Sequence, residues 1–307
     1  MKAKIKEMLQ ELRRDNTSGA REMIEKSLNI IQTYLTLISN EEKDIRRELK
    51  KLASKIISSR PSMATLIDTM GYLMGDKSIN TKKLILKRLE QFSAYREGQM
   101  NALEGHFRTL IDCLYKPNIK IMLISHSSTI NAVLSNYKEK TITFYVLESR
   151  PLLEGQRTAE YFSKDFQTNL IADSAMGKFI DDIDIVLVGI DSILKDGSIV
   201  NKIGTYPLAV LALENNKRVY AVGDSFKYNL RSHFGQKINI EEKLSAEIYE
   251  GANKNENLSV KNYYFDITPP QYITGIISDL GVHTPLDFLE EVKKSLNIQW
   301  FNEYIEK

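Results

Sequence analysis

An acid, an amide and a cation fall close together between residues 191 and 202 of this 307-residue chain. Asp191 follows a short apolar run, and Asn201 and Lys202 come just before the pair Gly204-Thr205. A carboxylate at the end of a strand can move a proton or hold a hydroxyl group, although it can also simply cap a turn. The lysine, the amide and the backbone N–H groups that follow could bind an anion where a helix begins. The stretch therefore predicts acid–base chemistry beside an anion site.

Polar groups also follow two other short apolar runs. One turn reads Ser125-His126-Ser127-Ser128-Thr129, whose hydroxyl and N–H groups could cradle a phosphate or only cap the next helix. The other contains Arg150 and Arg157, each of which could clamp a phosphate or lie on the surface. His126 is the histidine nearest these turns, and its default role is a hydrogen bond rather than catalysis.

Composition narrows the classes of partner. Lysine and arginine total 42 against 40 acidic residues, which gives no global reason to expect nucleic acid binding. No stretch approaches the roughly 18 consecutive apolar residues of a membrane span, and no signal peptide is recognisable. The single cysteine, Cys113, excludes an internal disulfide framework and favours a reducing compartment, so we expect a cytoplasmic protein. No cluster has metal-ligand spacing and no P-loop is present, so neither metal nor cofactor is expected.

The first part of the chain has the periodicity of helices. Apolar residues recur at helical spacing from residue 5 to about 115, as in Ile24, Leu28, Ile31 and Leu35. A further segment starts with Asn40-Glu41-Glu42, an N-cap candidate followed by acids, ahead of another apolar stripe. We therefore predict an N-terminal helical domain over residues 1–116.

The rest of the chain alternates short apolar runs with helix-length segments. The predicted strands are 119–124, 141–147, 168–171, 184–188, 218–222 and 263–267. Such alternation is typical of a mostly parallel sheet covered by helices on both faces. We predict a Rossmann-like α/β domain over residues 117–307. Because ligands bind outside the carboxyl ends of such strands, the polar turns described above should converge on one crevice.

Four separated strings resemble one known family. The longest is Val186-Leu-Val-Gly-Ile-Asp-Ser-Ile-Leu-Lys-Asp-Gly-Ser-Ile-Val-Asn-Lys-Ile-Gly-Thr205, and the others are Asp266-Ile-Thr-Pro-Pro-Gln-Tyr-Ile273, Ser18-Gly-Ala-Arg-Glu22 and Ser59-Arg-Pro-Ser62. They are similar to signatures shared by the α, β and δ regulatory subunits of translation initiation factor 2B, ribose-1,5-bisphosphate isomerase and methylthioribose-1-phosphate isomerase. The resemblance spans nearly the whole chain.

This resemblance implies a helical bundle, a Rossmann-like domain and a ligand between them. It places Asp191 at the family's catalytic aspartate. The family's phosphate-binding positions would fall on Gly19, Ala20, Arg21, Arg60, Arg150, Asn201 and Lys202.

The chain departs from the family's isomerases at Ser127, which stands where they have a cysteine in a Thr-His-Cys-type string. A thiol of pKa about 8.5 can exchange a proton near neutrality, whereas a hydroxyl needs an activating base. The departure favours a non-catalytic, α-like regulatory subunit that binds a phosphosugar or nucleoside phosphate. By the resemblance, its partners would be initiation factor 2 or homologous subunits.

Two other hypotheses remain open on sequence alone. One is a sugar-phosphate isomerase, such as a ribose-1,5-bisphosphate isomerase, in which His126 or an activated Ser127 works with Asp191. The other is a non-enzymatic sugar-phosphate-binding protein unconnected with translation. By the resemblance, the family forms dimers through the α/β domain, and the long helices carry more apolar stripe than one bundle needs. We therefore predict a homo-oligomer, either a dimer or a hexamer.

Overall fold

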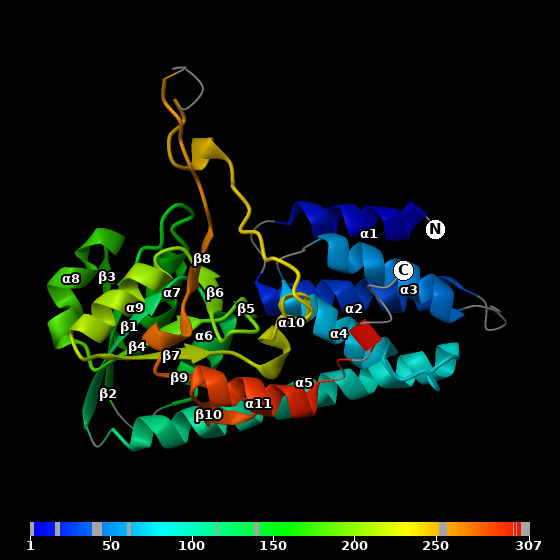
Figure 1. Ribbon diagram of the computed structural model, residues 1–307, viewed down its shortest axis with the longest axis horizontal. Coiled ribbons are helices and arrows are strands. Elements are labelled where there is room, and N and C mark those ends of the chain that lie inside the picture. Colours follow the sequence, from blue (N-terminus) through cyan, green and yellow to red (C-terminus); the bar gives the residue numbers. More distant parts are fainter. Residues whose placement is uncertain are drawn as a thin grey trace.

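The computed structural model describes residues 3–15, 19–38, 45–59, 63–114, 116–137, 141–251, 257–296, 298 and 300–301 (Figure 1). A helical first half and an α/β second half lie side by side, so the predicted fold class is confirmed. The predicted N-cap at 40–42 and the predicted phosphate ligand Arg60 fall outside the described residues. None of the helices in these ranges is both long and apolar enough to cross a membrane.

The described residues of the first half form the helices α1 (Ala3–Arg14), α2 (Ala20–Leu37), α3 (Ile45–Ser59), α4 (Ala64–Met74) and α5 (Lys82–Asp112). The α4 helix is apolar nearly all round and is buried by its neighbours, as expected of a central helix. The α5 helix begins at Thr81, whose hydroxyl accepts a hydrogen bond from Leu84 N at 3.3 Å. It has 31 residues and runs beneath both halves of the molecule (Figure 1).

The main sheet of the second half has the strand order β10-β9-β7-β4-β1-β2-β3. Its strands are β1 (Asn118–Ile124), β2 (Thr141–Leu147), β3 (Gln167–Ile171), β4 (Ile185–Gly189), β7 (Arg218–Val222), β9 (Gly275–Ser278) and β10 (Gly281–His283). All neighbours pair in parallel except β9 and β10. Five of the predicted strands therefore form the sheet as expected, while β9 and β10 were missed because they are short.

Both faces of this sheet are covered. Ile119, Ile121 and Leu123 pack in a cluster with α5, α6 (Ser128–Ser135) and α7 (Glu154–Phe162). Met122 and Ile124 point to the opposite face, into a cluster shared with α9 (Thr205–Glu214) and α11 (Pro285–Ser295). That second cluster continues into the helical half, so one core joins the two halves.

The remaining short elements are α8 (Met176–Phe179), α10 (Leu230–His233) and the 3-10 helices η1 (Asp173–Ala175), η2 (Ile180–Asp182), η3 (Ser225–Lys227), η4 (Ser245–Glu247) and η6 (Pro270–Tyr272).

A small antiparallel sheet lies beside the main one and corrects two predictions. It contains β5 (Ser192–Ile193), β6 (Ile199–Lys202) and β8 (Phe265–Thr268). The run predicted at 263–267 as a strand of the main sheet is β8, which pairs with β6 instead. Asn201 and Lys202 lie on β6 rather than at a helix start, because the apolar pair before them continues the ladder with β8. The following helix, α9, begins only at Thr205.

Polar contacts fasten α5 to the carboxyl edge of the main sheet. The Arg96 guanidinium binds Asp224 Oδ2 at 2.8 Å, and Gln99 Nε2 donates to Asp279 Oδ2 at 2.8 Å. Gln99 also donates to Ser225 Oγ at 3.0 Å, and Asp279 accepts from Ser225 N. These buried bonds hold the helical half at a defined position over the strand ends.

Candidate functional site

A cavity of about 510 Å³ lies between the two halves. Its wall is formed by the start of α2, the middle of α5 and the turns after β1, β4 and β7. The carboxyl-end rule for parallel sheets predicts a ligand site at this edge. The turn 125–129 and Asp191 meet in this wall, as the sequence predicted.

Asp191 is the acidic residue of the cavity wall that comes just after β4. Its backbone N–H donates to Val200 O at 3.0 Å, which fixes it against the small sheet. Removal from water raises the pKa of its carboxyl, and the nearby Lys227 and Lys202 oppose that rise only in part. A larger share of Asp191 is therefore protonated near neutrality than for an aspartate in water, so it is able to donate a proton.

Gly189 leaves room for two polar side chains at the end of β4. A Cβ atom at Gly189 would stand 3.3 Å from both Asn201 Oδ1 and Ser127 Cβ. The Asn201 amide is held by its Nδ2, which donates to Thr205 Oγ1 at 2.9 Å, so its oxygen stays directed toward Gly189. Ser127 is the N-cap of α6, where its Oγ accepts from Ile130 N at 3.3 Å.

Two helix N-termini open into the cavity. The first turn of α2 contributes Gly19, Ala20 and Arg21, and the start of α6 contributes residues 127–129. Gly19 supplies no side chain to cap α2, and within the described residues no side chain takes that role at its first turn. Arg21 is exposed and pairs with Glu25 at 3.4 Å. Each helix start favours an anion, because its unpaired N–H groups carry partial positive charge.

Comparison with known proteins identifies the family of this chain. The family model described as the Initiation factor 2 subunit family matches residues 16–285. The chain belongs to the Initiation factor 2 subunit family.

Proteins with three different names are similar to this member of the family. The ribose 1,5-bisphosphate isomerase of Methanocaldococcus jannaschii is 27% identical, with 92% of each chain covered. The methylthioribose-1-phosphate isomerase of Acetivibrio thermocellus is 31% identical over 86% of this chain and 71% of its own. The crystal structure of the translation initiation factor eIF-2B of Pyrococcus horikoshii OT3 matches with a TM-score of 0.79 at 25% identity, covering 94% of this chain and 100% of the other. The family predicted from the motifs is thus confirmed.

Lys202, although it lies in the family signature, is outside the cavity wall. Successive side chains of a strand point to opposite faces, so Asn201 faces the cavity while Lys202 points away. Its ammonium pairs with Glu154 Oε1 at 2.7 Å, and its side chain is only 3% exposed. The ring of Tyr264 lies 5.6 Å from the same ammonium. Phosphate binding by Lys202 stays a prediction.

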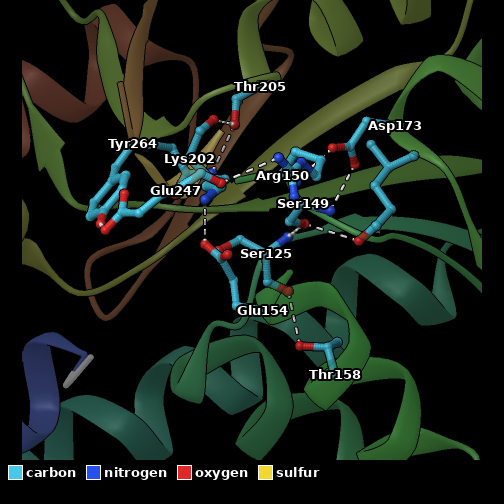
Figure 2. A network of polar contacts seen from close by, with 12 residues as sticks. Ser125, Ser149, Arg150, Glu154, Thr158, Asp173, Lys202, Thr205, Glu247 and Tyr264 are labelled. Atoms are coloured by element: carbon cyan, nitrogen blue, oxygen red, sulfur yellow. Dashed lines mark hydrogen bonds and ion pairs between the residues drawn. The ribbon is translucent and has the colours of Figure 1, made fainter. Parts of the chain in front are cut away.

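The two arginines predicted after β2 also lie outside the cavity wall. Figure 2 shows Arg150 turned toward the segment before β8, where it donates to Glu247 O at 3.3 Å. Its backbone N–H donates to Asp173 Oδ2 at 2.7 Å. Arg157 lies on α7, near enough to His126 to lower the pKa of that imidazole. A phosphate role for either arginine remains untested.

The start of α9 is occupied by a protein carboxylate, which corrects the predicted anion site at Gly204 and Thr205. Asp266 Oδ2 accepts from Gly204 N at 2.8 Å and from Tyr206 N at 3.1 Å. Burial raises the pKa of Asp266 to about 6 although these bonds oppose the rise. The carboxylate comes from the string that begins Asp266-Ile-Thr-Pro-Pro, so two of the family signatures meet here.

Lys227 is a cavity residue that the sequence interpretation missed. It ends η3 and is 6% exposed, and none of the described carboxylates forms an ion pair with it. Among nearby charges it has the largest effect on Asp191, whose pKa it lowers. Its neighbour Asp224 is held by Arg96. The strand-end rule could have found this lysine, since Gly-Asp-Ser-Phe-Lys227 directly follows the predicted strand 218–222.

Proposed function

We propose that this protein is an aldose–ketose isomerase for a phosphorylated ribose, with ribose 1,5-bisphosphate as the substrate to test first. The observation that carries the proposal is Asp191, a carboxyl with a raised pKa in the wall of a cavity that presents groups for anions. The isomerase name of the M. jannaschii relative, at 27% identity over nearly the full length, supports the same substrate class.

Two helix starts in the wall of one cavity support a bisphosphate over a monophosphate. The starts of α2 and α6 line the same space and come from different halves of the protein. Lys227 adds a cation between the strand end and the helical half. A ligand with a phosphate at each end would use both helix starts, whereas a single phosphate would leave one of them unfilled.

The reaction needs a group that first donates a proton as an acid and later accepts one as a base. The Asp191 carboxyl would protonate the ring oxygen as the bond between it and C1 breaks. A base removes the proton from C2, and the electrons of that C–H bond form a C1=C2 double bond. The Asp191 carboxylate then takes the proton of the C2 hydroxyl while C1 gains a proton. The product is a ketone at C2 and a CH₂ at C1, with no net change in electrons.

A non-catalytic role is the second candidate, and Ser127 is the specific observation in its favour. This serine uses its oxygen to cap α6 and stands where the family's isomerases have a cysteine. A regulatory subunit would bind the phosphosugar or a nucleoside phosphate without converting it, and would associate with initiation factor 2 or homologous subunits. A phosphosugar-binding protein outside translation would bind the ligand but not initiation factor 2 in a pull-down.

One pair of measurements separates these candidates. Purified protein is mixed with ribose 1,5-bisphosphate, and ribulose 1,5-bisphosphate is followed by ³¹P and ¹³C NMR while binding of the product is measured by calorimetry. Turnover at an enzyme-like rate supports the isomerase. Binding without turnover at high enzyme concentration supports the second candidate. The absence of both binding and turnover contradicts the phosphosugar site.

Sedimentation in the same buffer tests the proposed homo-oligomer, with dimer and hexamer as the alternatives.

Replacing Lys227 by methionine should weaken binding of ribulose 1,5-bisphosphate by about 10- to 100-fold, the equivalent of roughly 1.5–3 kcal/mol for a charge-assisted bond to phosphate. Methionine keeps the length and apolar stem of the side chain, so the fold should survive. Calorimetric titration measures the effect. Lys195→Met is the matched control, because Lys195 is exposed in the turn between β5 and β6. Equal affinity in the two variants would remove Lys227 from the site.

Replacing Gly189 by alanine should weaken the same binding by about tenfold, within the roughly 1–3 kcal/mol typical of overpacking. The added Cβ at 3.3 Å from Asn201 Oδ1 would push the amide away from its place in the cavity wall. Titration of Gly177→Ala provides the control, since a Cβ at Gly177 meets no atom within 4 Å. Full affinity in Gly189→Ala would mean that Asn201 does not touch the ligand.

A further inference from the structure

We propose that His126 Nε2 is the base that moves the proton between C2 and C1, in place of the cysteine that the family's isomerases have at the position of Ser127. The inference rests on the proposed isomerase function and assigns its second proton-transfer group. His126 lines the cavity together with Asp191 and is half-buried there. The free nitrogen of its ring can be derived from the hydrogen bonds of its neighbours.

Thr158 determines which ring nitrogen carries the proton. Its hydroxyl donates to Ser125 O at 2.9 Å, an interaction drawn in Figure 2. The same oxygen lies 2.9 Å from His126 Nδ1. A hydroxyl has a single hydrogen, which is already given to the carbonyl, so Thr158 Oγ1 accepts a hydrogen bond from Nδ1–H. The neutral imidazole therefore has its lone pair on Nε2.

Asn131 supports the same tautomer. Its amide lies 3.4 Å from His126 Nδ1, and its Oδ1 has no hydrogen-bond partner in the described part of the chain although it is buried. The oxygen and nitrogen of an amide are assigned from their partners, and exchanging them gives the buried oxygen the Nδ1–H as a donor. With that orientation Nδ1–H is shared between Thr158 and Asn131. No described residue bonds to Nε2.

Burial and one nearby cation favour the neutral form of the ring in the resting protein. Burial is the main cause that lowers the pKa of His126, and Arg157 lowers it further, while Glu154 acts in the opposite direction. A neutral ring at pH 7 is the form that can accept a proton. Once it has accepted one, the nearby Glu154 stabilises the cation, and the lowered pKa makes the return of the proton to C1 favourable.

The other candidate groups are less suited to the task. Ser127 Oγ serves as the N-cap of α6, and none of the described side chains accepts a hydrogen bond from it. Cys113 follows the end of α5 and is exposed, away from the cavity wall. The proton balance is simple: the C2–H bond breaks toward Nε2, and the resulting Nε2–H is transferred to C1.

The test compares His126→Gln with His233→Gln. His233 is a matched control, because burial also lowers its pKa and its Nδ1 bonds to a hydroxyl, Tyr228 OH at 2.8 Å, outside the cavity. We expect kcat for ribose 1,5-bisphosphate to fall by about 10²–10⁴-fold in His126→Gln and to be unchanged in His233→Gln. Ribulose 1,5-bisphosphate should still bind His126→Gln, and its C1 hydrogen should no longer exchange with D₂O.

A second measurement needs no turnover. Long-range ¹H–¹⁵N NMR of the protein, with its four histidines assigned by substitution, should show His126 as the Nδ1–H tautomer. Thr158→Val removes the acceptor that holds this tautomer, so the spectrum should show a mixture and kcat should fall by about tenfold with KM kept.

Several outcomes would overturn the assignment. They are an Nε2–H tautomer, exchange that persists in His126→Gln, or a loss in Ser127→Ala as large as that in His126→Gln. Wild-type protein that binds ribulose 1,5-bisphosphate but shows neither turnover nor C1 exchange would overturn both this inference and the isomerase. Turnover that survives His126→Gln would overturn this inference alone.

Discussion

Replacing Asp191 by asparagine should lower kcat for ribose 1,5-bisphosphate by about a thousandfold, since a positioned acid–base group typically contributes 10²–10⁴-fold. Asparagine has nearly the volume of aspartic acid but neither donates an acidic proton nor takes one up. Affinity for ribulose 1,5-bisphosphate should change little, because the anion-binding groups are untouched. Steady-state kinetics and calorimetry on the same preparation measure both effects.

Asp196→Asn is the matched control for this substitution. Asp196 is exposed in the turn between β5 and β6, and its Oδ1 accepts from Ser198 N at 3.0 Å. The same chemical change there should leave kcat at its original value. If Asp191→Asn retained more than about a tenth of the activity, Asp191 would not be the acid that opens the ring.

The dependence of rate on pH gives an independent check on Asp191. The reaction begins with its carboxyl protonated, so the rate should fall as pH rises through its pKa. Burial raises that pKa and Glu154 adds to the rise, while Lys227 and Lys202 oppose it. The high-pH limb of kcat/KM should therefore lie above the value of about 3.9 for an ordinary aspartate. A limb in that ordinary range would contradict the acid role.

Replacing Gly155 by alanine should lower the free energy of unfolding by at least about 3 kcal/mol, at the severe end of single substitutions. A Cβ at this position would stand 1.8 Å from Leu147 O. Rotation of a side chain cannot relieve this clash, because the positions of the Cβ atom and of the carbonyl oxygen are both fixed by the backbone. Gly155 lies in the first turn of α7, where its N–H donates to Glu148 O at 3.1 Å. The helix would have to move away from the end of β2. Urea denaturation followed by circular dichroism measures the change.

Gly98→Ala and Gly105→Ala are the controls for that experiment. Both glycines are in the interior of α5, and a Cβ at either meets nothing within 4 Å. Alanine there should raise stability by about 0.5–1 kcal/mol, because glycine is a poor helix former. If all three variants unfolded at the same urea concentration, close approach of α7 to β2 would not limit position 155.

The helical first half, the parallel strands and the family were all predictable from sequence. Helical spacing and short apolar runs are local patterns that survive without knowledge of contacts, since each element must bury one face or both. The turn 125–129 and Asp191 were also placed correctly in one wall, because parallel strands bring their carboxyl ends to the same edge.

Tertiary structure decided which of the two lysines, Lys202 or Lys227, lies in that wall. Lys202 stands in a strong family signature, but the alternation of side chains along β6 turns it toward Glu154, while Asn201 takes the cavity side. Lys227, in a less conspicuous string, is brought into the wall by the pairing of β7 with β4. The register of a ladder fixes these directions, and it depends on strands distant in sequence.

The sequence therefore predicted that Asp191, Asn201 and Lys202 lie near one another. Only the fold decided that Asp191 and Asn201 line the cavity and that Lys202 does not. Sequence also named His126 and Ser127 as alternatives without choosing between them. The choice follows from Thr158, a residue 32 positions from His126 whose single hydroxyl hydrogen is given to Ser125 O. A proton's position depends on partners in space, and spacing along the chain carries no information about it.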